Sequence, residues 1–520
     1  MPFTGAQLAA IHSIEQNAFT TTCLLVGGAG TGKSHTAMEA IKRVAVRTRC
    51  SVFVLCAAGA PLEKYRHEFA HNSLHANVHV MTLQSFNGLK PTQVATGRPT
   101  RAFIASAKAG GVRFGPVQPA TKVWLVVEEA FAASAELVNT AMLSAALLPH
   151  SGRSAKNVHL LMIGCPHQMP QVTGMCVFQA DVFHDKTRPV RRLVLTENKR
   201  CADATFEFKR LLHNLRYWST LGPEALRDAD NELMSLSQRG LPYGQKWIDC
   251  VKLVSTNAYA ARLNMQEAGL RYRRGEATVV FVGYRGKLSG PETLRMPAAD
   301  YHTVLWPGTA VVIFPGGIDA VAINDDTDIT KIPNSGKIEI TQLSTQRGVQ
   351  LSDKPLGEHL HVRCDEPAFA VVFATYNGKQ YRIDAMHGIC KTTKKPLHFM
   401  PISMMGSIVI NRAQGQDIAG PVAILMNDVH LDKLIDHIYT ALTRVTSARD
   451  AYISGYQPGA IIQAAAHLLK QTNVSATTAR EAVKRIDRLE LAQIKKTDKQ
   501  AAHRAAKRRR VIDVSDDDDD

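Results

Sequence analysis

The sequence predicts a globular α/β protein; two local patterns support the fold class, and the composition supports a globular chain. Residues 24–26 form a short apolar run of strand type, which a glycine-rich loop and a helical pattern follow directly. Residues 123–127 and 159–163 are further apolar runs that end at polar or glycine-containing segments, as strands of a parallel sheet do. Hydrophobic residues make up 45% of the 520-residue chain and charged residues 21%, an ordinary globular balance. A chain of this length suggests roughly three or four domains.

Charge and cysteine usage narrow the class of protein. The net charge is +16, and it rises to +22 when the six aspartates among the last ten residues are set aside, which favours a polyanionic partner such as nucleic acid. The nine cysteines include no CxxC pair, which indicates reduced intracellular thiols rather than a zinc site or a disulfide framework. No apolar run approaches the ~18 residues that span a bilayer, so we expect no membrane partner. The N-terminus lacks the pattern of a signal peptide.

The glycine-rich loop has the pattern GxxxxGK[ST] between a strand and a helix. Backbone N–H groups and the helix N-terminus of such a loop surround the β-phosphate of a nucleotide. Lys33 would reach the β- and γ-phosphates, and Ser34 would bind magnesium. The loop consists of Gly27, Gly28, Ala29, Gly30, Thr31, Gly32, Lys33 and Ser34.

A phosphate loop needs a second carboxylate that holds magnesium and activates water. Glu128 and Glu129 follow the apolar run 123–127, at the edge where a parallel sheet places its ligands. The alternative is a helix N-terminus that is rich in glutamate. The phosphate loop upstream favours the metal-and-base interpretation, so the sequence predicts a site for ATP and Mg²⁺.

A series of short motifs, in register over residues 4 to about 457, shares its order and spacing with one family. The chain resembles superfamily 1B DNA helicases of the PIF (petite integration frequency) and RecD-like family. Besides the phosphate loop, the matching segments are Gln7, 54–61, 81–86 (MTLQSF), 128–130 (EEA), 164–172 (GCPHQMPQV), 195–200 (LTENKR), 409–416 (VINRAQGQ) and 437–445 (HIYTALTRV).

The resemblance implies a role for each matching residue. Glu128 would hold magnesium, Glu129 would activate the attacking water, and Gln168 would sense the γ-phosphate. Arg200 and Arg444 would be arginine fingers that neutralise charge in the transition state. The catalytic set is therefore Lys33, Glu128, Glu129, Gln168, Arg200 and Arg444; Gln7, Gly415 and Gln416 would also contact ATP; Thr82, Ser85, Phe86, Asn411 and Arg412 would face single-stranded DNA.

Four positions depart from the family pattern. Glu128 replaces the usual magnesium aspartate, and Cys165 replaces the aspartate that follows glycine in GDxxQ. Asn411 and Arg412 replace a histidine and a lysine, and Ala58 replaces a threonine. The key catalytic residue types remain, so we expect an active motor with altered metal binding or coupling.

The resemblance implies two RecA-like P-loop motor domains with small inserted accessory domains, the second insert mostly β. We expect the first motor domain at 1–195, with a basic insert at about 86–121 that contacts the DNA backbone or is a solvated loop. The second motor domain would comprise 196–270 and 395–460, around a β-rich insert at 271–394. Within that insert, the Asn/Asp cluster of 324–336 predicts a loop.

The C-terminal part is expected to lie outside the motor. Residues 461–506 predict a basic helical extension. Lys507, Arg508, Arg509 and Arg510 fit a nuclear import signal. Val511, Ile512 and Val514, followed by acidic residues, resemble a SUMO-interacting motif, which would add a strand to a sheet edge of SUMO or a SUMO-modified protein. The alternative is a solubilising acidic end; the SUMO interpretation implies the nucleus of a eukaryotic cell, in a cellular or viral setting.

These expectations combine into one function. The resemblance implies an ATP-dependent helicase that translocates 5′→3′ on single-stranded DNA and unwinds forked duplexes in replication, recombination or repair. Two alternatives stay open: a helicase that acts on RNA, and a non-catalytic nuclear adaptor with a degenerate motor.

Overall fold

The structure is a computed structural model of the chain. No helix among the described residues is long and apolar enough to cross a membrane. The described residues are 2–47, 50–57, 59–69, 77–89, 122–148, 154–169, 174–273, 279–282, 302–312, 318–332, 337–345, 361–363, 370–384, 386–389, 396–399, 402–416, 418, 420–471 and 473–515.

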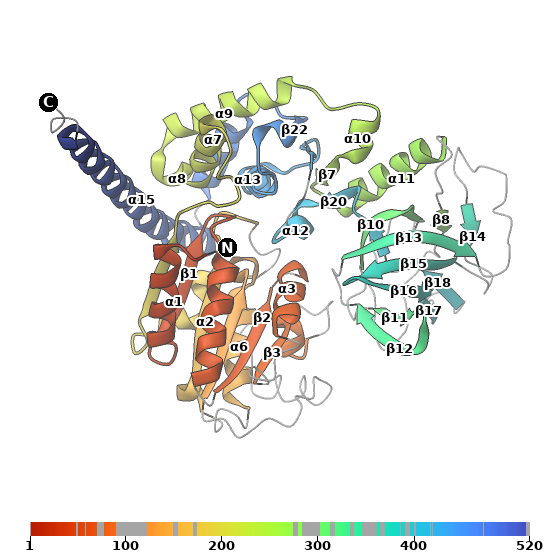
Figure 1. Ribbon diagram of the computed structural model, residues 1–520, viewed down its shortest axis with the longest axis horizontal. Helices are drawn as coiled ribbons and strands as arrows, with labels where there is room; N and C mark the ends of the chain where they lie inside the picture. Colours follow the sequence, from red (N-terminus) through yellow and green to blue (C-terminus); the bar gives the residue numbers. More distant parts are fainter. Residues whose placement is uncertain are drawn as a thin grey trace.

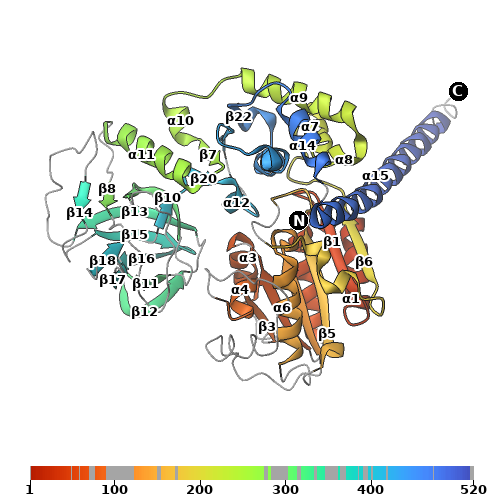
Figure 2. The same ribbon diagram turned by 180° about the vertical axis from the view of Figure 1, so that it is seen from behind.

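The domain expected as the first motor domain is a six-stranded parallel sheet with helices on both faces (Figures 1 and 2). The names first and second motor domain are kept below from the expected organisation of the chain. Its inner strands are buried on both sides, which explains why they read as continuous apolar runs. Leu25 packs toward α1, α2 and α3, whereas Leu24 and Val26 pack toward α6. In the order β3-β2-β4-β5-β1-β6, the strands are β1 (Thr22–Gly27), β2 (Cys50–Cys56), β3 (Val78–Thr82), β4 (Lys122–Glu128), β5 (Val158–Gly164) and β6 (Val190–Leu195). The helices are α1 (Gly5–Asn17), α2 (Lys33–Arg47), α3 (Gly59–Phe69), α4 (Leu83–Phe86) and α6 (Ala135–Ala146), with short 3-10 turns at Ala130–Ala132, Ala155–Asn157, Val177–Gln179 and Asp181–Phe183.

The second motor domain is a smaller parallel sheet in the order β20-β7-β21-β22. Its helices bury a large apolar cluster that includes Leu211, Leu233 and Ile438. The strands are β7 (Val251–Val254), β20 (Ser407–Val409), β21 (Val422–Leu425) and β22 (Ala451–Ser454). The helices are α7 (Phe206–Arg216), α8 (Trp218–Leu221), α9 (Pro223–Gln238), α10 (Gln245–Asp249), α11 (Asn257–Arg273), α12 (Ile410–Ala413), α13 (Leu434–Leu442) and α14 (Ala460–Lys470), with 3-10 turns at Leu431–Lys433 and Ala448–Asp450.

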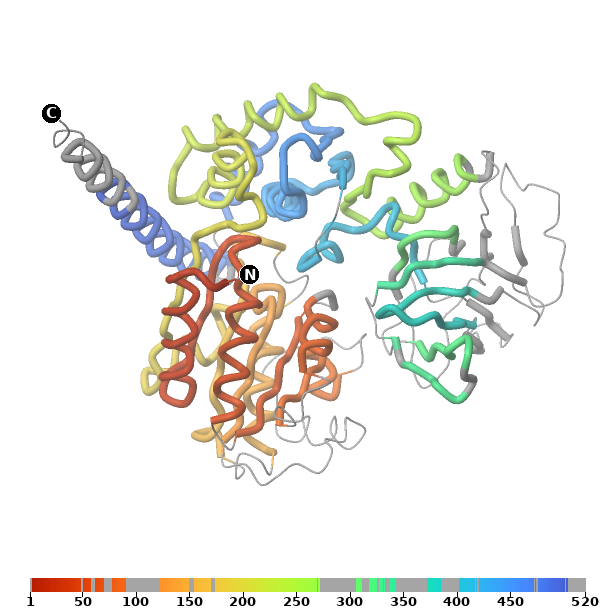
Figure 3. The backbone as a smooth tube through the Cα atoms, viewed as in Figure 1, coloured from red at the N-terminus to blue at the C-terminus, as the bar shows by residue number. Residues whose placement is uncertain are grey.

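Between α11 and α12 the chain forms a β-rich domain that lies beside the second motor domain. Its path can be followed in Figure 3. Its main sheet is antiparallel, in the order β12-β11-β16-β15-β13-β10-β19. These strands are β10 (Gly308–Val312), β11 (Ile318–Ala322), β12 (Asp325–Ile332), β13 (Lys337–Thr345), β15 (Ala370–Tyr376), β16 (Lys379–Asp384) and β19 (Ile402–Met404). The smaller sheets contain β8 (Val279–Val282), β9 (His302–Leu305) and β14 (His361–Arg363), and β17 (Met386–Ile389) with β18 (Pro396–Phe399).

The structure confirms the predicted fold class, two parallel α/β sheets with a mostly β insert, and it refines details within it. Strand β19 pairs with β10 although it lies beyond the expected boundary at residue 394, and β20 is the strand that rejoins the motor sheet. The loop predicted at 324–336 is wrong, because β12 pairs with β11 over much of this segment. Strand β12 is at the edge of the sheet, where polar side chains can face water. Most of the basic insert, residues 90–121, lies outside the described residues.

The segment predicted as one basic extension, 461–506, divides into two helices with different surroundings. Helix α14 contributes Ile461, Ala464 and Ala465 to the core of the second motor domain. Helix α15 (Val474–Ser515) packs Ile486 into the α6-side core of the first motor domain and then projects away from the body (Figures 1 and 2). The first part of α15 is therefore built into the motor.

Candidate active site

The glycine-rich loop connects β1 to α2, as the sequence predicts. Gly30 and Gly32 have φ of 77° and 80°, a backbone conformation that side chains with a Cβ rarely adopt. A Cβ on Gly30 would also lie 2.3 Å from Asn198 Oδ1. Lys33 Nζ donates to the carbonyl oxygen of Gly28 at 2.8 Å, and burial lowers the pKa of this amine. Lys33 is thus hydrogen-bonded to the phosphate loop itself.

Glu128 ends β4 beside this loop. Its Oε1 accepts from Ser34 Oγ at 2.7 Å, and its Oε2 accepts from Tyr65 Oη at 2.8 Å. Burial, followed by the neighbouring Glu129 carboxylate, raises the pKa of Glu128 to about 7. A buried carboxylate next to a serine hydroxyl is the oxygen donor set that Mg²⁺ prefers, so Ser34 and Glu128 fit this ion.

Glu129 has a strained backbone conformation that was not predicted from the sequence. Its φ of 52° and ψ of 45° place it in the left-handed region, which is uncommon for a residue other than glycine. Its Oε2 accepts from Gln414 Nε2 at 3.2 Å across the two motor domains. Sequence reasoning assigned the neighbours Gly415 and Gln416 to the cleft and missed Gln414, although this glutamine belongs to the same motif.

The two predicted arginine fingers come from the connection to the second motor domain and from the end of α13. Arg200 Nη1 donates to the carbonyl oxygen of Thr443 at 2.8 Å. Arg444 is 2% exposed, and its guanidinium donates to the carbonyl oxygens of Ala413 and Gln416 and to Thr443 Oγ1. Main-chain acceptors therefore fix the position of both arginines relative to each other.

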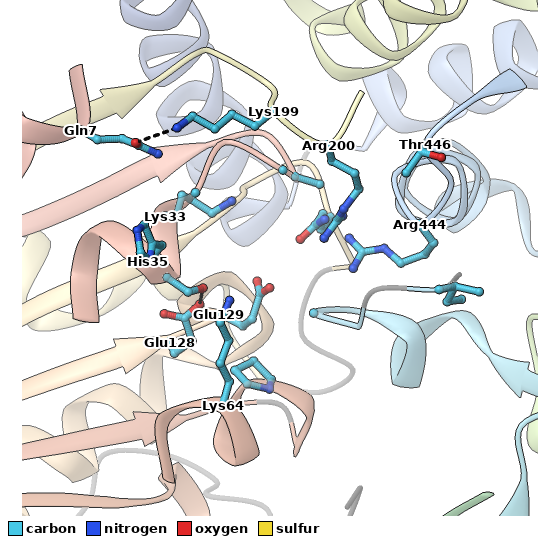
Figure 4. Close-up of a pocket in the computed structure, with 18 residues that line it drawn as sticks. Gln7, Lys33, His35, Lys64, Glu128, Glu129, Lys199, Arg200, Arg444 and Thr446 are labelled. Carbon is cyan, nitrogen blue, oxygen red and sulfur yellow. Dashed lines mark hydrogen bonds between the residues drawn. The ribbon is translucent and has the colours of Figure 1, made fainter. Parts of the chain in front are cut away.

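One cleft of about 590 Å³ gathers all six predicted catalytic residues. Arg200 and Arg444 lie on the side opposite Lys33 and Glu128 (Figure 4). Gly27, Gly28, Thr31 and Gln416, which were predicted to bind ATP, do not line the cleft directly. The lining residues are Gln7, Ala29, Gly30, Gly32, Lys33, Ser34, His35, Pro61, Lys64, Glu128, Glu129, Gln168, Lys199, Arg200, Gly415, Ile418, Arg444 and Thr446.

Gln7 caps α1 and also contacts the phosphate loop. Its side chain and that of Thr4 cap the N-terminus of α1 reciprocally. Gln7 Nε2 donates to the carbonyl oxygen of Thr31 at 3.1 Å, and Gln7 Oε1 accepts from Lys199 Nζ at 3.3 Å (Figure 4). These bonds place Gln7 at the cleft, where the sequence predicted it.

Four of the predicted DNA-facing residues are at least partly exposed, and one, Phe86, is buried. Thr82 caps α4 by accepting from the backbone N–H of Ser85, and Arg412 is exposed on α12 beside Asn411. The prediction that Phe86 faces DNA is wrong. Phe86 is 2% exposed, and its ring packs against Phe53 at 5.2 Å between centroids in the core of the first motor domain.

The backbone at the C-terminal motifs is helical in this structure. Residues 507–514, predicted as an import signal and a SUMO-interacting segment, belong to the last turns of α15. Strand addition to SUMO would require residues 511–514 to unwind. The acidic residues 516–520 lie outside the described residues.

Comparison with known proteins identifies the architecture. No protein-family model and no curated protein matches the sequence. Among solved structures, Pif1 helicase from Candida albicans superposes with a TM-score of 0.60 at 16% identity, over 90% of this chain and 99% of that one. The chain has the Pif1 helicase fold.

Two Bacteroides structures extend this likeness. Pif1 bound to single-stranded DNA gives a TM-score of 0.54 at 15% identity, over 88% of this chain and 94% of that one. Pif1 in complex with ADP-AlF3 and single-stranded DNA gives 0.55 at 14% identity, over 91% and 98%. The Pif1 fold thus extends through both motor domains and the β-rich insert, and it confirms the family resemblance at the level of fold.

Proposed function

We propose that this protein is an ATP-dependent DNA helicase that translocates 5′→3′ on single-stranded DNA and unwinds duplexes in replication, recombination or repair. The observation that carries the proposal is the single cleft that gathers Lys33, Glu129 and Arg444 with the other predicted catalytic residues. Residues far apart in the sequence meet there, from both motor domains. The Pif1 fold supports the same function, because Bacteroides Pif1 has been crystallised with ADP-AlF3 and single-stranded DNA.

The cleft provides groups for each task of ATP hydrolysis. The phosphate loop and Lys33 would bind the triphosphate, and Arg200 and Arg444 would stabilise the charge that develops as the γ-phosphate leaves. Glu129, held by Gln414, would accept the proton of the attacking water. Ser34 and Glu128 would hold Mg²⁺, which neutralises phosphate charge when bound.

Because Arg444 and the phosphate loop belong to different motor domains, ATP binding would draw the domains together. Hydrolysis would remove the bridging phosphate and let the cleft reopen. Alternating grip on the strand would then move the protein along DNA. The 5′→3′ direction is proposed from the family resemblance.

The polar and basic residues of the DNA-facing group would hold the strand. Asn411 Oδ1 is buried without a hydrogen-bond partner among the described residues, and the neighbouring Arg412 is exposed. With a net charge of +16, the protein should bind single-stranded DNA with little base preference and with an affinity that falls steeply as salt increases. Unchanged affinity between low and physiological salt would contradict this mode of binding.

The proposal is tested by ATP turnover with and without single-stranded DNA, and by unwinding of 5′-tailed, 3′-tailed and RNA-containing duplexes. We expect DNA-stimulated turnover and unwinding of 5′-tailed DNA only. Activity confined to RNA-containing substrates would favour the RNA helicase. Nucleic-acid binding without any turnover would favour the adaptor.

The tail supports a proposal of its own about location and partners. Lys507 to Arg510 would direct the protein to the nucleus, and residues 511–514 would bind SUMO after unwinding from α15. A titration of the tail peptide with SUMO should show weaker binding when Val511, Ile512 and Val514 are changed to alanine. Equal affinity of both peptides would leave only an acidic end.

A further inference from the structure

A buried arginine lies where the two motor domains and α15 meet, and sequence reasoning missed it. Arg216, the last residue of α7, is 4% exposed. Its Nη1 donates to Cys165 Sγ at 2.9 Å and to Tyr439 Oη at 3.0 Å. Cys165 follows β5 at the position where the resembled motif has an aspartate. The chain therefore places a thiol, rather than a carboxylate, beside this guanidinium.

The carboxylate comes instead from the C-terminal helix. Glu490 of α15 is 0% exposed, and its two oxygens accept from Arg216 Nη2 at 2.8 and 2.7 Å. Glu490 Oε2 also accepts from Arg216 Nε at 3.1 Å and from Tyr217 Oη at 2.8 Å. This multiple pairing is the geometry in which guanidinium and carboxylate interact most strongly.

A second carboxylate on the same face of α15 touches both motor domains. Asp487 precedes Glu490 by three residues, which puts the two side chains on one face of the helix. Asp487 Oδ1 lies 2.6 Å from His167 Nε2 in the first motor domain, and Asp487 Oδ2 accepts from Thr220 Oγ1 at 2.9 Å in α8 of the second. Asp487 is also 0% exposed.

These contacts lie directly behind the candidate active site. A Cβ built on Gly28 of the phosphate loop would lie 3.0 Å from Arg216 Nη1, and the carbonyl oxygen of the same glycine accepts from Lys33. His167 immediately precedes Gln168, which lines the cleft. The acid pair of α15, Asp487 and Glu490, thus reaches the phosphate loop through Arg216 and the Gln168 motif through His167, and neither Arg216 nor His167 lines the cleft.

Packing alone does not account for the acid pair. Ile486 already anchors α15 in the apolar core of the first motor domain, with Ala482 and Val483 packed around it. Burying charged side chains is costly, and a buried ion pair adds little net stability compared with apolar residues of similar size. It does fix the orientation of the groups that it joins, which is what a catalytic cleft requires.

We propose that Asp487 and Glu490 are positioning residues of the motor, and that Glu490 supplies from α15 the carboxylate that the chain lacks at position 165. In this role α15 joins the two motor domains behind the cleft and holds Arg216 against the phosphate loop. The inference rests on the proposed ATPase function of the cleft. It makes the first half of α15 part of the ATPase unit rather than an appendage.

The test compares Glu490→Gln with Glu481→Gln, a matched change on the exposed face of the same helix. Glu490→Gln should lower DNA-stimulated kcat by roughly ten- to hundredfold, because a displaced catalytic loop costs about that much, and should leave the KM for ATP nearly unchanged. Glu481→Gln should behave as wild type. Unchanged kcat in a folded Glu490→Gln protein would overturn the proposal.

Rescue separates positioning from mere structural support. Adding Cys165→Asp to Glu490→Gln restores a carboxylate beside Arg216, so the double variant should regain most of the lost kcat. If the double variant folds but stays as slow as Glu490→Gln, Glu490 does not replace a carboxylate at position 165, and the proposal fails.

Amide hydrogen exchange tests the arrangement without depending on activity. Glu490→Gln should accelerate exchange in residues 27–34 and in residues 482–492, whereas Glu481→Gln should not. If wild-type protein has no ATPase activity but shows this pattern, the proposed function fails and the contact between α15 and the phosphate loop stands. Normal turnover in wild type with unchanged exchange in Glu490→Gln would refute the positioning role alone.

Discussion

Two buried glutamates near the phosphate loop differ in the groups that donate hydrogen bonds to them. Glu128 accepts from two neutral hydroxyls, those of Ser34 and Tyr65, and its pKa is raised to about 7. Glu490 accepts from the guanidinium of Arg216. The comparison teaches that burial alone does not define a functional carboxylate. Glu128 in the cleft would gain from an added cation. The contact between Arg216 and Glu490 under α15, called the junction below, contains its own cation.

The largest loss of ATP turnover should come from removing the ammonium group of Lys33. Lys33→Ala should reduce DNA-stimulated ATP turnover at least about a hundredfold, since a group that stabilises transferring phosphate contributes ~3 kcal/mol or more. The melting temperature and the exchange protection of α15 should stay near wild type, because the junction has its own ion pair. A variant that retains most of the wild-type turnover would refute the assignment of the phosphate loop.

Arg444→Ala should follow, with a fall in turnover of about a hundredfold and a much smaller loss of ATP affinity. The guanidinium is already oriented by the carbonyl oxygens of Ala413 and Gln416, so its charge is available mainly to the transition state. Arg449→Ala, at an exposed site in the same domain, is the control. An equal loss of nucleotide affinity and turnover would make Arg444 a ground-state ligand instead.

The affinity of the Glu128 site for Mg²⁺ should depend on pH. In metal-free protein Glu128 is protonated below its pKa of about 7, so the apparent affinity for Mg²⁺ should fall about tenfold for each pH unit below that value. Titration of Mn²⁺ as a probe, with Glu128→Gln as control, measures this. An affinity independent of pH between 5.5 and 7.5 would show that Glu128 is not a ligand.

The same shift has a consequence for stability. Because burial raises the pKa of Glu128, the metal-free folded state binds more protons than the unfolded state between the usual carboxyl pKa and about 7. This group therefore stabilises the fold at low pH, and its contribution is lost as pH rises toward 7. Added Mg²⁺ should offset the loss, which melting curves with and without the ion can follow.

The smallest effect should come from the end of the chain. Removing residues 507–520 should change turnover and unfolding by no more than about twofold, because the hydrogen bonds that join α15 to the motor domains among the described residues end at Glu490. Removing residues 474–520 takes away those contacts and should lower kcat as Glu490→Gln does. Similar turnover for both truncations would show that the junction does not support the cleft.

Local motifs predicted the cleft well because they combine chemistry with short spacing. The phosphate loop and the Glu128–Glu129 pair each lie within a few residues, next to strands whose apolar runs are unambiguous. Gln414 was predictable from the same motif, because it directly precedes Gly415 and Gln416. Phe86 was misplaced because its motif predicts a position in the chain and does not reveal which side of α4 faces the core.

The junction could not be predicted in the same way. Arg216 and Glu490 are far apart in the sequence, and each looks like a solvated charge on an amphipathic helix. Only tertiary packing brings them together and removes water from both. The boundary of the β-rich insert was hard for a related reason, since β19 and β20 have similar sequences of apolar residues yet belong to different sheets.

The divided second motor sheet has a consequence for how the chain acquires its structure during synthesis. Strand β7 ends at Val254, but its neighbours β20 and β21 begin only at Ser407 and Val422. At roughly 5–20 residues per second, β7 leaves the ribosome on the order of ten seconds before either partner exists. The first motor sheet and the insert can fold meanwhile as separate units. The second sheet should form late because its strand pairing is non-local. We expect the nascent protein to need a chaperone most while β7 is still unpaired.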